Sequence, residues 1–253
     1  MKTLTRLAKI RVDLWEVLLV GALLAMIPFV FRGGRPTSER ELEPYSVRYG
    51  PDHQSEDAEE WFIRDFFADR RGGFFVDVGA NDPRKFSKTW YLEKQLGWSG
   101  IAVEPLAQFA PAYKTERPQT RFRSFFVSDT SDAAARLYVI SGNTAVSSSD
   151  PNFTGSFGKA DRVETVPTIT MNDLLDKERV TAIDFLNVDI ELHEPMALKG
   201  FDVMRYKPAL VCIEALLPVR QQILDYFARH GYVVVGKYLR ADQENLYFTP
   251  LGG

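Results

Sequence analysis

Cysteine is nearly absent from this chain of 253 residues, and histidine is scarce, with three residues. The only cysteine is Cys212, so no disulfide can form within the chain, and a small disulfide-stabilised fold is excluded. Cys212 lies in an apolar run, residues 209–215, where a cysteine is usually a small core residue rather than a nucleophile. With 45% hydrophobic residues, the chain is long enough to form one well-buried α/β domain and an appendage.

An excess of positive charge is also missing. The chain has 31 lysine and arginine residues against 34 aspartate and glutamate residues, which gives a formal net charge of -3. No basic stripe with interleaved aromatic side chains stands out in the sequence. Such a chain has little electrostatic field to attract a polyanion, so we expect no nucleic-acid partner.

The chain also lacks the glycine residues that a dinucleotide-binding turn requires. The apolar run at 74–78 predicts a buried strand, and the small residues that begin with Gly79 predict a tight turn after it. A second predicted strand, 101–103, ends in Glu104, an acid that can accept hydrogen bonds from both hydroxyls of a ribose. A dinucleotide-binding turn needs Gly-x-Gly-x-x-Gly, and only Gly79 is present here. The pattern indicates a nucleoside-bearing ligand without a pyrophosphate and disfavours an NAD-dependent oxidoreductase.

One long hydrophobic run is present, residues 14–31, which is apolar except for Glu16 and follows a basic start. About twenty apolar residues span a bilayer core, so the run is just long enough for a transmembrane helix. No small-x-small cleavage pattern follows it, which disfavours a cleaved signal peptide. We predict a basic N-terminus and membrane anchor at residues 1–32, a polar linker at 33–56 and one globular domain at 57–253.

Strand and helix patterns alternate within the predicted domain, which indicates a doubly wound, mostly parallel sheet of α/β type. Helical spacing of the aromatic residues from Trp61 to Phe67 predicts a helix that packs on this sheet. Strands are expected at 74–78, 101–103, 121–127, 136–140, 183–190 and 210–213, with a closing pair at 232–235 and 246–248. Further helices are expected at 87–96, capped by Ser87, around 196–198 and at 218–230, and a long polar loop at 141–158.

Four sequence blocks carry a resemblance to a known family. They are Val-Asp-Val-Gly-Ala-Asn-Asp-Pro (76–83), Phe-Ser-Lys-Thr-Trp-Tyr-Leu-Glu-Lys (86–94), Gly-Trp-Ser-Gly-Ile-Ala-Val-Glu-Pro (97–105) and Ile-Asp-Phe-Leu-Asn-Val-Asp-Ile-Glu (183–191). Together they resemble the FkbM-type S-adenosylmethionine-dependent methyltransferases, over residues 61–248. The resemblance implies a class I methyltransferase (Rossmann-like) fold with a seven-stranded sheet, and S-adenosylmethionine as the donor of a methyl group, most often to a hydroxyl oxygen.

The same resemblance implies a set of cofactor-binding residues. Asp77, Gly79 and Asn81 would surround the amino-acid and sulfonium end of the cofactor, Glu104 would bind the ribose, and Ser128 with Asp129 would lie on the adenine side.

Three positions depart from the family pattern. Pro83 follows the Asn-Asp pair where many relatives have glycine, and a proline there leaves the preceding turn intact. Asn187 stands in place of a lysine and Leu192 in place of a glycine, in the segment where the chemistry would take place. These two departures keep open the alternative of a catalytically inactive, membrane-tethered binding module.

Candidate catalytic residues lie in this segment. Alternate residues of a strand share one face, so Asp189 and Glu191 would point to the same sheet edge. Methyl transfer to a hydroxyl needs a group that removes the proton, and Asp189 is our first choice, followed by Glu191 and His193. A helix-start role for Glu191 and Glu194 and a solvent-exposed place for His193 are the competing interpretations. These residues could also bind a metal, but they follow no firm spacing rule, and we assign no metal ligand from the sequence.

The predicted anchor suggests a small-molecule or lipid-linked acceptor at the membrane, such as a sugar or glycolipid, because tethering raises the local concentration of the two partners. The polar loop at 141–158 is a candidate for the element that admits this acceptor. Basic residues flank the hydrophobic run on both sides and lean only weakly toward a cytoplasmic N-terminus. Since S-adenosylmethionine is made inside the cell, we expect a single-pass membrane protein whose catalytic domain is cytoplasmic. The sequence makes no prediction of the oligomeric state.

Overall fold

The computed structural model describes residues 39–252. The predicted anchor at 1–32 therefore lies outside the described residues. Within residues 39–252, no helix has both the length and the apolar character needed to cross a membrane.

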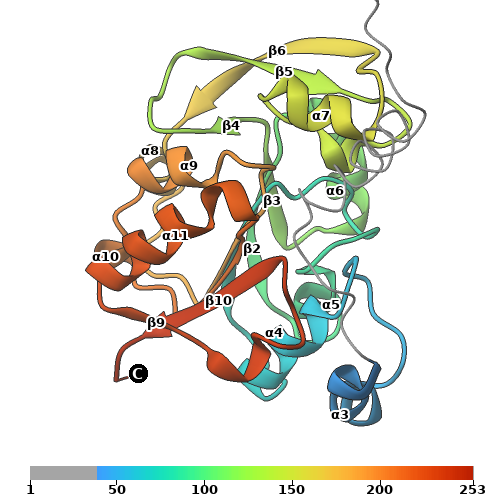
Figure 1. The fold of residues 1–253 in the computed structure, drawn as a ribbon, viewed down its shortest axis with the longest axis vertical. Helices are drawn as coiled ribbons and strands as arrows, with labels where there is room; N and C mark the ends of the chain where they lie inside the picture. Colours follow the sequence, from blue (N-terminus) through green and yellow to red (C-terminus); the bar gives the residue numbers. More distant parts are fainter. Residues whose placement is uncertain (1–38, 253) are drawn as a thin grey trace, which may run out of the picture.

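A seven-stranded sheet forms the centre of the domain, in the order β3-β2-β1-β7-β8-β10-β9 (Figure 1). The strands are β1 (Phe74–Val78), β2 (Ser99–Val103), β3 (Thr120–Arg123), β7 (Phe185–Val188), β8 (Leu210–Glu214), β9 (Tyr232–Val234) and β10 (Asn245–Pro250). β10 runs antiparallel to β8 and β9, and the other neighbouring pairs are parallel. The predicted doubly wound, mostly parallel sheet and its closing strand pair are confirmed.

Helices cover both faces of this sheet (Figure 1). One apolar core lies against α8 (Met171–Lys177), α9 (Glu194–Lys199), α10 (Val203–Tyr206) and α11 (Leu217–Arg229). A second core lies against α3 (Glu39–Tyr49), α4 (Glu59–Phe67) and α5 (Trp90–Lys94). Alternate side chains of one strand reach opposite faces, so Val76 belongs to the first core and Phe75 to the second. Cys212 is fully buried in the second core, as predicted.

A smaller, three-stranded sheet with the order β4-β6-β5 was not predicted. Its strands are β4 (Phe126–Val127), β5 (Ala134–Val139) and β6 (Arg162–Ile169). The single strand expected at 121–127 is in fact divided between the two sheets as β3 and β4. β6 was missed because its residues alternate between charged and apolar and include Pro167, whereas the buried strands are continuous apolar runs.

Helical segments also occur where loops or linkers were predicted. The expected loop at 141–158 contains a 3-10 turn, η2 (Thr144–Val146), and α7 (Pro151–Phe157), whose first turn is capped by Asp150. α3 lies inside the predicted polar linker and packs against the second core. The helix expected at 87–96 is shorter, because only α5 is helical, but the Ser87 hydroxyl does accept the N–H of Trp90. The remaining elements are α6 (Ala110–Glu116), η1 (Ala107–Phe109) and η3 (Gly236–Tyr238).

One buried arginine holds the segment between β1 and α5 in place. The guanidinium of Arg117 is fully buried and forms an ion pair with Glu93 at 2.6 Å. It also donates to the carbonyl oxygens of Pro83 at 2.9 Å and Thr89 at 3.1 Å, and to the hydroxyl of Ser87 at 3.3 Å. Since a guanidinium has five N–H donors, this side chain can fix a whole loop without help from solvent.

We expect replacement of this arginine to destabilise the domain strongly. In Arg117→Met the buried carboxylate of Glu93 would lose its cationic partner, and breaking a buried ion pair from one side costs about 3–5 kcal/mol of the free energy of unfolding. Chemical denaturation of both proteins measures the difference. Arg205→Met is the control, because Arg205 pairs with Asp176 at the exposed surface, and its loss should leave the denaturation midpoint nearly unchanged. Equal midpoints for Arg117→Met and the wild type would contradict this role.

Candidate functional site

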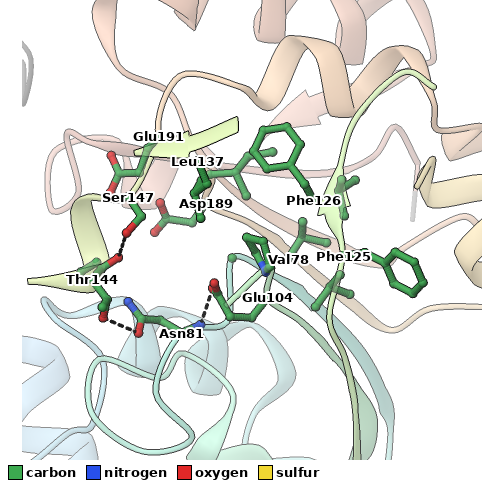
Figure 2. A pocket seen from close by; sticks show the side chains of 16 residues that line it. Val78, Asn81, Glu104, Phe125, Phe126, Leu137, Thr144, Ser147, Asp189 and Glu191 are labelled. Atoms are coloured by element: carbon green, nitrogen blue, oxygen red, sulfur yellow. Dashed lines mark hydrogen bonds between the residues drawn. The ribbon is translucent and has the colours of Figure 1, made fainter. Parts of the chain in front are cut away.

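A cleft opens at the carboxyl ends of the central strands, where the strand order reverses between β1 and β7. Five of the predicted site residues line this cleft together: Gly79, Asn81, Glu104, Asp189 and Glu191. The last four are labelled in Figure 2. They come from the ends of β1, β2 and β7, which a parallel sheet brings to one edge.

The cleft has two arms that share Gly79, Asn81, Ala145 and the two acids at the end of β7. The narrow arm has a volume of about 40 Å³ and runs past Glu104 between apolar side chains that include Phe126 and Leu137. The wide arm has a volume of about 510 Å³ and contains Lys85 and Lys88. The wide arm is thus within the size range of small-molecule sites, whereas the narrow arm has room for a few water molecules.

Gly79 brings the ends of β1 and β7 into close contact. Its φ is +85°, and a Cβ atom at this position would lie 1.7 Å from the carbonyl oxygen of Asp189. The turn is held by hydrogen bonds from the Gly79 N–H to Val103 and from the Asp189 N–H to Val78, both at 2.9 Å. Only glycine allows both this φ and this approach, so the predicted role of Gly79 in a tight turn agrees with its geometry.

Glu104 is a buried carboxylate at the end of β2. One oxygen accepts the N–H of Asn81 at 3.1 Å and the other accepts the N–H of Leu106 at 2.9 Å. Burial raises the pKa of Glu104 to about 7, although these two amides favour the ionised form. The side-chain oxygen of Asn81 in turn accepts the hydroxyl of Thr144 at 3.1 Å, which ties η2 to the wall of the cleft (Figure 2).

Asp77 is not among the residues that line the cleft. It is 2% exposed and lies beneath the turn, where it accepts the hydroxyl of Thr89 at 2.7 Å and the side-chain amide of Asn187 at 2.9 Å. Burial raises its pKa. Asn187, which stands where the family pattern has lysine, therefore still provides a hydrogen-bond donor to this acid.

The turn after β7 has an unusual backbone. Glu191 has a φ of 56° and Leu192 a φ of 75°, both in the left-handed region that favours glycine. Leu192 stands where the family pattern has glycine. The backbone therefore keeps the conformation that a glycine would adopt, and the side chain of Leu192 packs against the apolar core instead.

Lys88 is a buried cation that the sequence interpretation did not assign. Its ammonium lies 2.6 Å from a carboxylate oxygen of Asp189 and 3.7 Å from one of Glu59. Burial opposes its charge, but the carboxylates of Asp189 and Glu59 outweigh burial and raise its pKa well above the usual value. The sequence does place Lys88 between the polar residues Ser87 and Thr89, but its partners are distant in the chain and could not be inferred.

His193 lies apart from the acids of the cleft. Its ring nitrogens lie 3.1 Å from the hydroxyl of Ser128 and 3.4 Å from that of Ser149, and its ring packs against Phe126. Burial lowers its pKa, which favours the neutral form of the ring. Ser128 also donates to Asp129 at 3.3 Å. Among the predicted residues, Ser128, Asp129 and His193 thus form a separate hydrogen-bonded group that does not line either arm of the cleft.

Glu214, the last residue of β8, is the second residue that sequence interpretation missed. Its carboxylate lies within 4.8 Å of those of Asp189 and Glu191. Burial and the charges of these two acids raise its pKa well above the usual value. An acid directly after an apolar strand is the same signal that identified Glu104, so the predicted strand at 210–213 could have led to it.

Comparisons with solved structures find distant methyltransferases. The Burkholderia thailandensis 1,6-didemethyltoxoflavin-N1-methyltransferase, crystallised with 1,6-didemethyltoxoflavin and S-adenosylhomocysteine, has a TM-score of 0.38 and 11% identity over 92% of this chain and 88% of that one. A putative RNA methyltransferase of Pyrococcus horikoshii has a TM-score of 0.35 and 12% identity over 85% and 100%. The Haemonchus contortus phosphoethanolamine N-methyltransferase 1, in complex with phosphoethanolamine and S-adenosylhomocysteine, has a TM-score of 0.34 and 11% identity over 83% and 43%.

No curated protein matches the sequence. The sequence pattern of the methyltransferase FkbM domain matches residues 77–234, which is more than half of the chain and includes the cleft residues from Gly79 to Glu214. The resemblance found in the four sequence blocks is thereby confirmed, and with it the cofactor, S-adenosylmethionine. The chain belongs to the FkbM methyltransferase domain family and is an S-adenosylmethionine-dependent methyltransferase.

Proposed function

We propose that this methyltransferase transfers the methyl group to a hydroxyl oxygen of an acceptor bound in the wide arm of the cleft. The observation that carries the proposal is the arrangement of carboxylates around the cleft. A buried acid, Glu104, lines the narrow arm and is the proposed ribose ligand, and two further acids, Asp189 and Glu191, line both arms. One edge of the sheet thus combines a nucleoside-binding group with groups that can accept a proton.

The residues of the narrow arm fit a nucleoside. The carboxylate of Glu104 can accept two ribose hydroxyls, and Phe126 and Leu137 offer apolar surfaces for a base. At about 40 Å³ the arm is too small for an adenosine as it stands, and Thr144 of η2, which is hydrogen-bonded to Asn81, lines it. We therefore propose that Thr144–Val146 moves away when the cofactor enters.

When bound, S-adenosylmethionine supplies a methyl group that is activated by its positively charged sulfur. The acceptor oxygen forms a bond to the methyl carbon while the carbon–sulfur bond breaks, and the hydroxyl proton must pass to a base. Asp189 and Glu191 are the proposed bases, and His193 is a weaker candidate because it is not among the residues that line the two arms. The ion pair with Lys88, at 2.6 Å, keeps the carboxylate of Asp189 oriented.

An inactive binding module is the second candidate function, because Asn187 and Leu192 depart from the family pattern. Two observations favour the active enzyme. Asn187 donates to Asp77, and Leu192 keeps the left-handed turn that the family glycine would form. Turnover of S-adenosylmethionine to S-adenosylhomocysteine in the presence of an acceptor would exclude the inactive alternative.

Removal of the proposed ribose ligand should weaken cofactor binding. A hydrogen bond to a charged group contributes about 1.5–3 kcal/mol, so Glu104→Gln should raise the Kd for S-adenosylmethionine by roughly 10- to 150-fold. Isothermal titration calorimetry measures this change, and thermal unfolding verifies that the variant folds. Glu116→Gln, an exposed acid on α6, is the matched control and should bind as the wild type does. If Glu104→Gln folded and bound with unchanged affinity, the ribose would lie elsewhere.

Cofactor affinity should also depend on pH. The pKa of Glu104 is raised to about 7, so in the free protein this carboxyl is mostly neutral below that pH and mostly ionised above it. Since the ribose hydroxyls donate to the ionised form, the Kd should fall as the pH rises from about 6 to about 8, and binding below pH 7 should release a proton. Calorimetry in two buffers with different ionisation enthalpies measures this proton. Glu104→Gln should lack the effect, and an equal pH dependence in that variant would assign the titration to another group.

We further propose that the acceptor is a sugar or lipid-linked sugar at a membrane, with the catalytic domain on the cytoplasmic side. The hydrophobic sequence at residues 14–31 supports this proposal. With radiolabelled S-adenosylmethionine, the full chain should methylate a glycolipid in vesicles faster than its water-soluble sugar head group, and the product should be a base-stable methyl ether. Equal rates on both would argue against a membrane acceptor, and a label on nitrogen would contradict O-methylation. A reporter fused after Gly253 and found outside the cytoplasm would overturn the orientation.

A further inference from the structure

Three carboxylates converge where β7 and β8 end side by side. Asp189 and Glu191 follow β7, Glu214 ends β8, and the two strands are paired in parallel up to Val188 and Ile213. One carboxylate oxygen from each acid lies within 4.8 Å of the others. The three acids line a cavity of about 30 Å³, which has room for one ion and a water molecule.

Glu214 points to a ligand independently of this convergence. Glu214 is 9% exposed, and its Oε2 atom is buried without any hydrogen-bond partner. A buried carboxylate oxygen without a partner is costly, because it has lost its water and gained nothing in return. A cation between Glu214 and the two acids of the β7 end would remove this cost.

The spacing of the oxygens restricts the choice of ion. Around Mg²⁺, with bonds of about 2.0–2.1 Å, opposite oxygens lie roughly 4.2 Å apart, and around Ca²⁺ they lie roughly 4.6–5.2 Å apart. A spread of up to 4.8 Å suits Ca²⁺ without rearrangement, and a small side-chain rotation would suit Mg²⁺ or Mn²⁺. Ligands that are all carboxylates suit such oxygen-preferring ions, whereas imidazole and thiolate ligands are typical of Zn²⁺ sites.

We propose that Asp189, Glu191 and Glu214 bind one divalent, oxygen-preferring cation beside the wide arm of the cleft. The role of this cation rests on the proposed function, because a cation there could bind the acceptor's hydroxyl and make its proton easier to remove. Each carboxylate has a second oxygen, so Glu191 could bind the cation through one oxygen and take the proton on the other. His193, which the sequence offered as a further possible ligand, is not a member of the cluster.

The test measures cation binding directly, without cofactor or acceptor. The full chain is first treated with EDTA and then titrated with Mn²⁺, followed by electron paramagnetic resonance, and separately with Mg²⁺ and Ca²⁺ by calorimetry. We expect one bound ion per chain. Glu214→Gln should raise the Kd for Mn²⁺ by at least about tenfold, because loss of an indirect partner of a metal already costs 10- to 100-fold.

A matched control distinguishes a built site from general attraction by acids. Glu56→Gln removes one charge from the wall of the same cavity but leaves the three ligands in place, so its Kd should stay within about twofold of the wild type. Equal weakening in both variants would mean that the cavity attracts cations without a specific site, and this would overturn the proposal.

Thermal unfolding gives a second measurement that does not depend on activity. The cation should raise the Tm of the wild type but not that of Glu214→Gln, which should be at least as stable as the wild type in EDTA because it relieves repulsion among the acids. No binding of any of the three ions to the wild type would overturn the proposal. That result would not contradict the proposed methyl transfer. Bound Mn²⁺ without turnover of S-adenosylmethionine would instead contradict the proposed function.

Discussion

The site depends on one close contact, between Gly79 at the end of β1 and the carbonyl oxygen of Asp189 at the end of β7. No side chain fits between them, since a Cβ atom on residue 79 would lie 1.7 Å from that oxygen. This contact lies where the strand order reverses, so it closes the floor of the cleft. It also sets where the backbone turns after β7, and therefore where Asp189 and Glu191 emerge.

A parallel sheet then supplies the acids. Glu104, Asp189 and Glu214 each follow the last apolar residue of a strand, and the strands end at the same edge. Several carboxylates thus lie close together, and burial of a carboxylate costs free energy unless it has a partner. Glu104 accepts hydrogen bonds from two backbone amides, and Asp189 forms an ion pair with Lys88. The partner of Glu214 is the proposed cation. Binding of the cofactor and of the cation would then offset the free-energy cost of placing these carboxylates together.

The parts of the fold that could be predicted are those encoded locally. Continuous apolar runs identified β1, β2, β7 and β8, and an acid after a strand identified Glu104. What could not be predicted depends on contacts between distant segments. Lys88 meets Asp189 across 101 residues of sequence, and β6 looks like an exposed loop until β5 pairs with it. The ion-pair partner and the convergence with Glu214 become visible only when the strands are assembled.

A crystal structure of the full chain with S-adenosylhomocysteine and Mn²⁺ would test the central claim most directly, namely that this cleft holds the methyl donor beside a cluster of acids. We predict the ribose hydroxyls within hydrogen-bond distance of Glu104, Thr144–Val146 moved away from Asn81, and an anomalous peak for Mn²⁺ between Asp189, Glu191 and Glu214. An adenosine bound away from Glu104 would contradict this claim. So would a structure in which the acids contact neither the ion nor the space next to the sulfur.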